Sequence, residues 1–265
     1  MKAGFYQFNP SFGQKETNLR KVLSALEGVD ADLIVLPEFF ATGYQFVSGE
    51  EVAELSEEIP GGGTVAELEH LSRRKNLYLV AGLPERDGEK FYNSAVLIGP
   101  RGLMGTYRKT HLYFEEKLYF SPGDSGFKVW KTELGHIGIM ICFDWFFPES
   151  MRTLSLMGAE VVAHPANLVL PWCPQAMPIR CLENGAFAIT ANRTGVESRK
   201  QGQPLRFIGQ SQIASPDGRV LVRASEDEEG VLIADIDPAI ARNKSLNPLN
   251  DLFGDRRPGM YRYEG

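Results

Sequence analysis

Residues 134–150 read Leu-Gly-His-Ile-Gly-Ile-Met-Ile-Cys-Phe-Asp-Trp-Phe-Phe-Pro-Glu-Ser, and this stretch decides the fold class. Its first half, residues 136–141, is apolar, rich in β-branched residues and interrupted by glycine, which is typical of a strand in a sheet covered on both faces. Polar and aromatic residues begin at Cys142, and Pro148 followed by Glu149 predicts the first turn of a helix. A buried strand that runs into a helix in this way indicates an α/β protein.

Cys142 is a candidate nucleophile because of its place in this pattern. It lies at the end of a buried strand, where open α/β sheets bind their ligands. The positive end of the following helix dipole is expected to favour the thiolate over the thiol. Most free cysteines are small buried core residues, so this interpretation needs support from other stretches.

The composition is that of a globular protein with a large core. The chain has 265 residues, of which 43% are hydrophobic and 23% are charged. The net charge is −6 and no basic run is interleaved with aromatic residues, so no nucleic-acid partner is expected. We expect one domain over residues 1–265, with a polar tail from about residue 243 to 265 that packs on the domain or on a partner subunit.

The N-terminus and the cysteine usage predict a cytoplasmic protein. The first residues are too few and too polar for a signal peptide, and no stretch approaches a membrane span. The three cysteines, Cys142, Cys173 and Cys181, lack CxxC spacing, and the four histidines form no HExxH pair. We therefore expect neither a disulfide framework nor a metal site.

Hydrophobic periodicity predicts strands that alternate with helices, with no linker rich in Pro, Gly or Ser. The predicted helices span residues 16–28, 48–58, 64–75, 148–157 and 176–184, and Thr64 and Glu67 are spaced as a capping box. The predicted strands span residues 3–8, 31–36, 77–83, 93–98, 103–107, 127–131, 136–141, 160–164, 187–192, 207–214, 219–223 and 231–235. This mixture of βα units and hairpins predicts a single-domain, four-layer α-β-β-α sandwich.

Two further strand ends carry chemically active side chains. The buried strand within residues 32–44 ends in Glu38, and the strand within residues 105–116 runs into a loop at Lys109. Taken singly, such charges are usually solvated surface groups. Together with Cys142 they provide the thiol, carboxylate and ammonium needed for acyl transfer through a thioester. The carboxylate would activate the thiol, and the ammonium and backbone N–H groups would stabilise the oxyanion.

The motifs LPEFFATGY, YRKTHL and ICFDWFFPES resemble, in this order, those of the nitrilase superfamily, the carbon–nitrogen hydrolases with a Glu-Lys-Cys triad. The resemblance covers essentially the whole chain, including AHPANLVLP, PIRCLENGAFAITANRTG and GQSQIASPDG. It is closest to the short, stand-alone prokaryotic members. It implies the α-β-β-α sandwich, no metal or organic cofactor, and a homodimer or higher homo-oligomer packed through helices after the nucleophile and near Cys181.

The resemblance also implies roles for the matching residues. Cys142 would be the nucleophile, Glu38 the general base and later the acid, and Lys109 the oxyanion stabiliser. The backbone N–H of Phe143 would assist Lys109. Each role follows from the position of the residue in its motif.

Family members carry a second glutamate a few positions after the lysine, and Glu116 is our choice, with Glu115 as the alternative. Motif position also predicts a group of pocket residues, each of which could equally be core or turn. These residues are Tyr44, Trp145, Phe146, Asn167, Leu168 and Trp172. Asp144 is expected to hydrogen-bond within its own turn.

We expect a hydrolase that cleaves a small aliphatic amide to acid and ammonia through a cysteine thioester. A nitrilase acting on small aliphatic nitriles is the first alternative, since the same triad can form a thioimidate, and an N-carbamoyl amidohydrolase is another. A binding or regulatory protein with weak catalysis is an alternative of a different class. A Cys-His thiol hydrolase that uses His111 is the last, although a structural histidine is the simpler interpretation.

Overall fold

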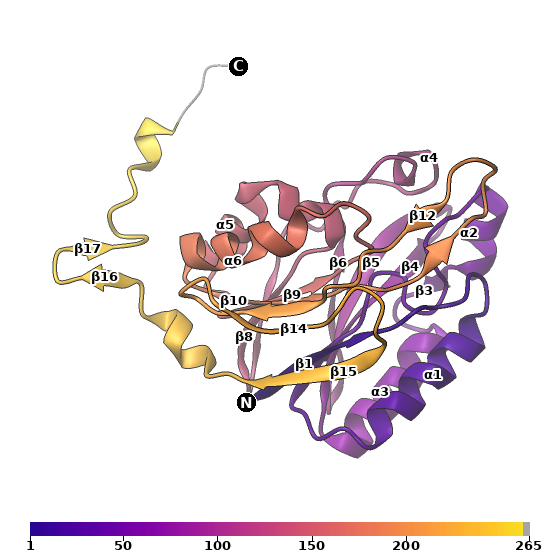
Figure 1. The fold of residues 1–265 in the computed structure, drawn as a ribbon, viewed down its shortest axis with the longest axis horizontal. Coiled ribbons are helices and arrows are strands. Elements are labelled where there is room, and N and C mark those ends of the chain that lie inside the picture. The colour runs from indigo at the N-terminus through magenta and orange to yellow at the C-terminus, as the bar shows by residue number, and fades with distance from the viewer. Residues whose placement is uncertain (262–265) are drawn as a thin grey trace.

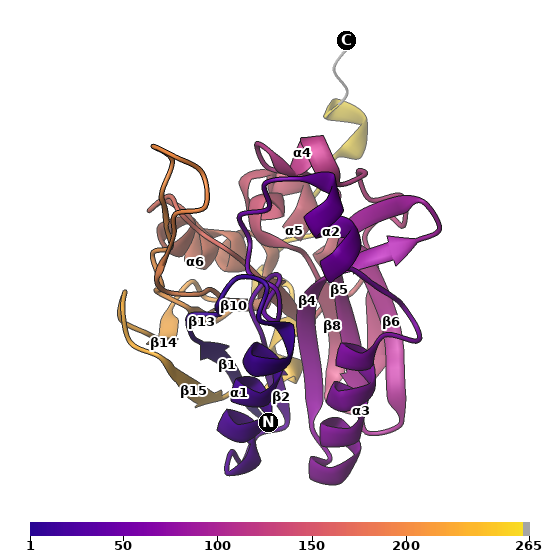
Figure 2. The same ribbon diagram turned by 90° about the vertical axis from the view of Figure 1, so that its right-hand side faces the viewer.

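The computed structural model describes residues 1–261 of the chain, so the last four positions of the predicted tail, 262–265, lie outside the described residues. The described residues form two main sheets packed face to face, and helices cover both outer faces (Figures 1 and 2). This is the predicted α-β-β-α sandwich.

The first sheet, in the described part of the chain, has seven strands in the order β15-β1-β2-β4-β5-β6, with β3 paired to β4. Its strands are β1 (Lys2–Gln7), β2 (Leu33–Val35), β3 (Glu57–Glu58), β4 (Tyr78–Asp87), β5 (Lys90–Gly99), β6 (Gly102–Arg108) and β15 (Gly230–Asp235). The neighbours β1, β2 and β4 run parallel, whereas β4, β5 and β6 are antiparallel. Helices α1 (Lys15–Glu27) and α3 (Gly63–Lys75) cover its outer face, and α2 (Gly49–Leu55) contacts β4.

The second sheet has six strands among the described residues, in the order β14-β13-β10-β9-β8-β7. Its strands are β7 (Val129–Thr132), β8 (Gly135–Ile139), β9 (Val161–Pro165), β10 (Phe187–Ala191), β13 (Gln212–Ala214) and β14 (Val220–Arg223). Helices α5 (Pro148–Leu156) and α6 (Cys173–Asn184) cover its outer face (Figure 1). The strands β8, β9 and β10 are parallel, so their carboxyl ends meet at one edge.

The remaining elements are short. They are α4 (Glu116–Tyr119), the 3-10 helices η1 (Cys142–Phe146), η2 (Pro238–Arg242) and η3 (Pro258–Met260), and the two-stranded pairs β11 (Val196–Glu197) with β12 (Leu205–Arg206) and β16 (Ser245–Asn247) with β17 (Asn250–Asp251). The β16–β17 hairpin extends away from the sandwich (Figure 1). Lys244 Nζ, just before it, donates to the carbonyl oxygens of Asn184 and Gly185 at 3.0 and 2.7 Å. None of the described helices is long and apolar enough to cross a membrane.

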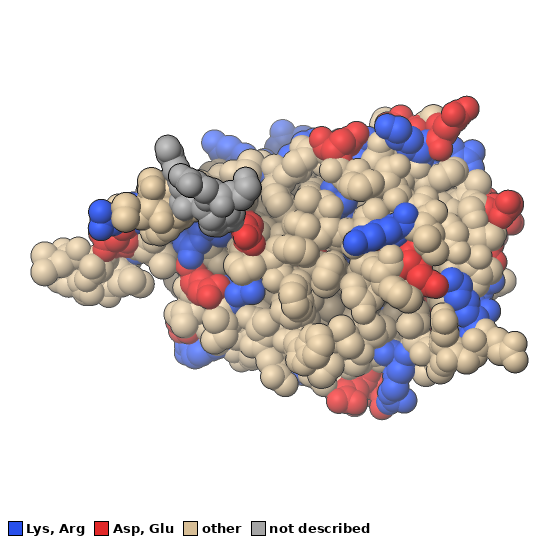
Figure 3. Space-filling view, turned by 90° about the horizontal axis from the view of Figure 1, so that it is seen from above, with Lys and Arg blue, Asp and Glu red and all other residues tan. Residues whose placement is uncertain are grey.

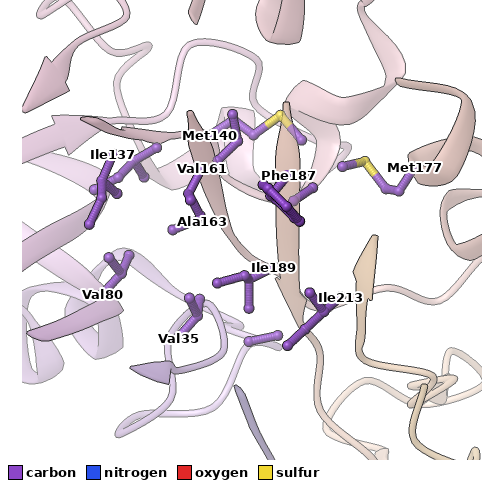
Figure 4. Packing of buried hydrophobic residues seen from close by; sticks show 14 of the residues in the cluster. Val35, Val80, Ile137, Met140, Val161, Ala163, Met177, Phe187, Ile189 and Ile213 are labelled. Atoms are coloured by element: carbon purple, nitrogen blue, oxygen red, sulfur yellow. The ribbon is translucent and has the colours of Figure 1, made fainter. Parts of the chain in front are cut away.

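Side chains of the central strands alternate between two cores, as the period of two in a β-strand requires. Val35 on β2 lies in the core between the sheets, where Figure 4 shows Val35 and Val80 facing Ile189 of the second sheet. The neighbouring Ile34 lies in the other core, with Leu26 of α1. All five side chains are fully buried. Because both faces are covered, these strands are continuously apolar in sequence.

Two predictions near α3 were wrong, for one reason. The first turn of α3 is not capped by Thr64 and Glu67; instead the carboxylate of Glu57 accepts the N–H of Thr64 at 3.3 Å and of the next residue at 3.2 Å. The helix predicted over residues 48–58 ends at Leu55, because Glu57 and the following glutamate pair with β4 as a short strand. Both differences come from a partner outside the local sequence pattern.

The strand predicted over residues 207–214 is shorter than expected. Only Gln212–Ala214, β13, pairs with the sheet. Gln210 has φ of 55°, in the left-handed region, and this interrupts the extended backbone. Phe207 lies outside the sheet: its N–H donates to the Gly195 carbonyl at 3.0 Å, and its ring centre lies 4.0 Å from the guanidinium carbon of Arg193, a cation–π contact.

His164 on β9 connects the second sheet to the turn at Cys142. Its Nε2 lies 3.0 Å from the Cys142 carbonyl oxygen, and its Nδ1 lies 3.1 Å from Thr190 Oγ1. A carbonyl can only accept, so Nε2 carries the hydrogen and the Thr190 hydroxyl donates to Nδ1. Burial lowers the pKa of His164 to about 4, so the imidazole is neutral in the folded protein near neutral pH.

We predict that His164 makes folding stability sensitive to acid. The unfolded chain binds a proton at a histidine pKa of about 6.5, whereas the folded protein resists protonation down to about pH 4. The stability linked to His164 is therefore complete above the unfolded pKa and is lost as the pH falls toward the folded pKa, by on the order of 3 kcal/mol. Urea unfolding near pH 7 and at about pH 4.5 measures this loss.

The His164→Gln variant should lose less stability between these two pH values than the wild type. The control is His70→Gln, which makes the same substitution at an exposed histidine on α3. An equal pH dependence of unfolding in the wild type and in His164→Gln would contradict the prediction.

Candidate active site

Glu38 is placed by a close approach between two backbone segments. It follows β2, and a Cβ added to Gly82 of β4 would lie 2.5 Å from the Cα of Glu38, so only glycine fits there. The Phe40 N–H donates to the Gly82 carbonyl at 3.2 Å, and the Gly82 N–H donates to the Pro37 carbonyl at 3.3 Å. Phe39 has φ of 51°, in the left-handed region, and turns the chain directly after Glu38. The Glu38 side chain is fully buried as a result.

Lys109 follows β6 and lies between two carboxylates. Its Nζ is 2.7 Å from Glu38 Oε1 and 2.8 and 2.9 Å from the two carboxylate oxygens of Glu116. Burial alone would lower the pKa of Lys109, but the negative charges of Glu116 and Glu38 outweigh it, and the pKa lies above its ordinary value. Lys109 is therefore an ammonium ion although it is fully buried.

Glu116, not Glu115, contacts Lys109. The Tyr44 hydroxyl donates to Glu116 Oε1 at 2.7 Å, and the Tyr113 N–H donates to Oε2 at 3.2 Å. Burial, and then the charge of Glu116, raises the pKa of Tyr44 well above its ordinary value, so its hydroxyl remains a donor. Glu115 turns outward and pairs with Lys200 at 2.7 Å.

Cys142 opens the short helix η1 in a strained conformation. Its φ is 40°, in the left-handed region, which is uncommon for a residue other than glycine. Asp144 holds the turn, because its Oδ2 accepts the Ile141 N–H at 2.9 Å and the Tyr107 hydroxyl at 2.8 Å. The sequence suggested that Asp144 bonds within its own turn, and it does, but it also accepts a hydrogen bond from Tyr107 outside that turn.

The Cys142 thiol is protonated in the resting protein. Burial raises its pKa well above the ordinary value, the charge of Glu38 raises it further, and Lys109 opposes both. The sequence analysis expected a helix dipole to favour the thiolate, but α5 begins only at Pro148 and burial acts on the pKa of the thiol in the opposite direction. Burial also raises the pKa of Glu38, and the charge of Lys109 acts in the opposite direction.

His111 is engaged by Asp144. Its Nδ1 lies 2.7 Å from Asp144 Oδ1, and its backbone N–H donates to the same oxygen at 3.1 Å. Its ring stacks on Phe147, with the ring centres 3.8 Å apart. This arrangement is that of a structural histidine, and it gives no support to a Cys-His hydrolase.

A cavity of about 240 Å³ opens beside Cys142, and most of its lining is apolar. It is lined by Tyr113, Cys142, Phe143, Trp145, Phe146, Asn167, Leu168, Val169, Leu170 and Trp172. A second cavity of about 250 Å³ lies on the side of the carboxylates and is lined by Tyr44, Glu115, Glu116 and Gln203 among others. Tyr113, Asn167 and Val169 belong to both. Every predicted pocket residue therefore lines one of the two cavities.

Figure 3 shows the molecule from the side that carries α4, α5 and α6 in Figure 1. Charged side chains of both signs are scattered over this face, without a large patch of one sign. The residues that the structure describes contain no group of three or more His, Cys, Asp or Glu side chains placed to hold a metal ion.

The sequence analysis did not identify Asn93. This residue, on β5, donates from Nδ2 to Glu38 Oε1 at 2.6 Å, and its carbonyl accepts the Lys109 N–H at 2.7 Å. A buried amide needs hydrogen-bond partners. The asparagine at the start of a predicted apolar strand therefore indicated a buried hydrogen-bonded group, although the sequence does not show which residues it bonds to.

The sequence analysis also did not predict the buried ion pair between Arg193 and Glu197. The Glu197 carboxylate accepts the backbone N–H of Tyr44 at 3.1 Å and of Gln45 at 2.6 Å. It therefore holds the loop whose tyrosine bonds to Glu116. Nothing in the local sequence around Glu197 indicates this contact.

Comparisons with known proteins agree with this geometry. Residues 2–244 match the model of the family described as carbon-nitrogen hydrolase. A nitrilase of Pyrococcus abyssi is 50% identical over 98% of this chain and 99% of its own length. An (R)-stereoselective amidase of a Pseudomonas species is 35% identical over 95% of this chain and 91% of its own.

A solved structure of an amidase from a Nesterenkonia species covers 98% of this chain and 94% of its own, with a TM-score of 0.80 and 26% identity. The predicted superfamily, sandwich fold and enzyme class are thereby confirmed. The chain belongs to the carbon–nitrogen hydrolase family of the nitrilase superfamily, and it is a hydrolase that acts on C–N bonds.

Proposed function

We propose that this protein is an amidase that hydrolyses small aliphatic amides to acid and ammonia through a cysteine thioester. The observation that supports this best is the buried cluster in which Lys109 bonds to both Glu38 and Glu116 close to the Cys142 thiol. This cluster supports a mechanism that needs a base, a cation and a nucleophile side by side in a site shielded from water.

In the first step, the Glu38 carboxylate accepts the Cys142 proton while Sγ attacks the amide carbon. The electrons of the C=O π bond move to the oxygen, and the Lys109 ammonium and the Phe143 N–H stabilise the oxyanion. The tetrahedral intermediate then collapses and the C–N bond breaks. The proton held by Glu38 passes to the nitrogen, so ammonia leaves and the acyl group remains on sulfur.

Water completes the cycle. The oxygen of a water molecule attacks the thioester carbon while Glu38 takes a proton from that water, and Lys109 again stabilises the oxyanion. The C–S bond breaks, the proton returns to Cys142, and the carboxylic acid is released. Glu116 keeps Lys109 charged and in place throughout, because it contributes two of the three carboxylate contacts to Nζ.

The relatives support an amide substrate. In structures of variants of the Nesterenkonia amidase, acrylamide or the acetamide moiety of fluoroacetamide is attached to the active-site cysteine. The cavity of about 240 Å³ beside Cys142, walled by Trp145 and Trp172, suits a small apolar acyl group. A nitrilase is the second candidate, because the relative that is 50% identical bears that name.

Ammonia release from a panel of small aliphatic amides and matching nitriles tests this function. The wild type should release ammonia from amides, and the mass of an acyl adduct should appear on Cys142. The Cys142→Ala variant is the blank, because it has no nucleophile. Ammonia from nitriles alone would favour the nitrilase, and full activity of Cys142→Ala would exclude the thioester mechanism.

Removal of the oxyanion cation should lower turnover strongly. We expect kcat of Lys109→Ala to fall by about 100-fold, which is typical for one oxyanion donor. The control is Lys200→Ala, which removes an ammonium paired to Glu115 near the surface and should leave kcat unchanged. Because Lys109→Ala leaves Glu38 and Glu116 buried without a counter-charge, thermal unfolding must show that the variant is folded. Unimpaired turnover of a folded Lys109→Ala would refute the role of Lys109.

We further propose a cytoplasmic homodimer. The three cysteines are free and buried, which suits a reducing compartment. Large apolar side chains on the outer helices α5 and α6 are exposed, namely Leu156, Ile179 and Leu182, and such surfaces often form interfaces. Light scattering should give twice the chain mass of 29.5 kDa, and the mass of a single chain would contradict the dimer.

A further inference from the structure

Asn93 contacts every charged member of the buried cluster. Its Nδ2 lies 2.6 Å from Glu38 Oε1 and 3.4 Å from Glu116 Oε2. Its backbone carbonyl accepts the Lys109 N–H at 2.7 Å. The side chain is almost fully buried, with 1% of its surface exposed. Apart from Asn93, the only side chain in the described part of the chain that donates to the Glu38 carboxylate is that of Lys109.

The chemistry of the neighbours fixes the orientation of this amide. Both carboxylates can only accept hydrogen bonds when ionised, so the NH₂ end of Asn93 must face them. The opposite orientation would place Oδ1 against two negatively charged groups. The strand itself is rigid here, because Asn93 pairs with Pro84 on β4 and the next residue pairs with Arg108 on β6. Asn93 is therefore fixed by the sheet rather than by a loop.

This contact makes the two oxygens of Glu38 unequal. Oε1 receives hydrogen bonds from both Lys109 and Asn93. Oε2 is buried and has no hydrogen-bond partner among residues 1–261. A buried carboxylate oxygen without a donor is costly, so it readily accepts a proton that is brought to it. The Cys142 thiol is close enough for the charge of Glu38 to raise its pKa.

We infer that Asn93 is a positioning residue: its amide fixes Glu38 so that Oε2 alone is free to accept the proton of Cys142. The inference rests on the proposed function, in which Glu38 is the base. The proton moves from Sγ to Oε2 as the new bond to sulfur forms. Asn93 takes no part in that transfer, and it acts only through the orientation and ionisation of Glu38.

The hydrogen bond also predicts a direction for a pH effect. Burial raises the pKa of Glu38, and the hydrogen bond from Asn93 lowers it. Removal of this donor therefore raises the pKa of Glu38 further. The carboxylate is then protonated, and lost as a base, at a higher pH than in the wild type. Replacement of a residue with a purely structural role would not change the pH at which Glu38 is lost as a base.

The rate of Cys142 alkylation by iodoacetamide, followed by mass spectrometry over a range of pH, tests the inference without a known substrate. In the full-length wild type the alkylation rate should fall at low pH as Glu38 becomes protonated. We call this fall the acid limb, and Glu38→Gln should remove it. Asn93→Leu, which keeps the branched shape of the asparagine side chain but has no donor, should shift the limb to higher pH and slow alkylation on it by about tenfold, as expected for a lost hydrogen bond to a charged group.

Two variants serve as controls. Asn184→Leu replaces another buried asparagine, whose amide donates to the Arg180 carbonyl on α6, and it should keep the wild-type limb. Asn93→Ser retains a hydrogen-bond donor on a smaller side chain, so it should shift the acid limb less than Asn93→Leu. The serine variant also provides a measurement if the leucine variant does not fold.

The outcomes separate the two proposals. If Glu38→Gln keeps the wild-type limb, the base in the proposed function is wrong, and the inference about Asn93 is overturned with it. If Glu38→Gln removes the limb while the Asn93 variants leave it in place, or slow alkylation equally at every pH, the inference about Asn93 alone is overturned.

Discussion

The structure of this site depends on one interaction, the buried contact of the Lys109 ammonium with the carboxylates of Glu38 and Glu116. Transfer of three charges out of water is expensive, and their mutual attraction offsets it only when the geometry is good and the remaining atoms are hydrogen-bonded. The surrounding contacts meet that condition for the carboxylate oxygens of the cluster except Glu38 Oε2. Gly82 lets the backbone of Glu38 approach β4, and the Tyr44 hydroxyl satisfies Glu116.

The sandwich brings these groups together because each follows a strand. Glu38 comes after β2 and Lys109 after β6 in the first sheet, whereas Cys142 follows β8 in the second. The two sheets pack face to face, so strand ends from both can meet at one edge of the shared core. His164 lies on β9, the strand next to β8 in the second sheet. Its Nε2–H donates to the Cys142 carbonyl and so fixes the turn at the nucleophile candidate.

Sequence alone predicted most of the strands, the layers and the strand ends that carry Glu38, Lys109 and Cys142, because hydrophobic runs and the residues that end them are local signals. It did not predict what depends on distant partners. Asn93 bonds to a residue 55 positions away, and Glu197 supports Tyr44 from 153 positions away. The helix-dipole argument for Cys142 likewise left out the burial by distant segments, which raises the pKa of the thiol.

The charge balance of the cluster explains why Lys109 is paired with two carboxylates instead of one. At rest it holds one positive and two negative charges beside a neutral thiol, and a thiolate would add another buried negative charge. In the proposed mechanism the thiol proton neutralises Glu38 as the oxyanion forms, so the total charge does not change. The negative charge only moves from Glu38 to the oxyanion, while Glu116 continues to hold Lys109. Proton transfer and attack are therefore favourable together, although formation of the thiolate alone is not.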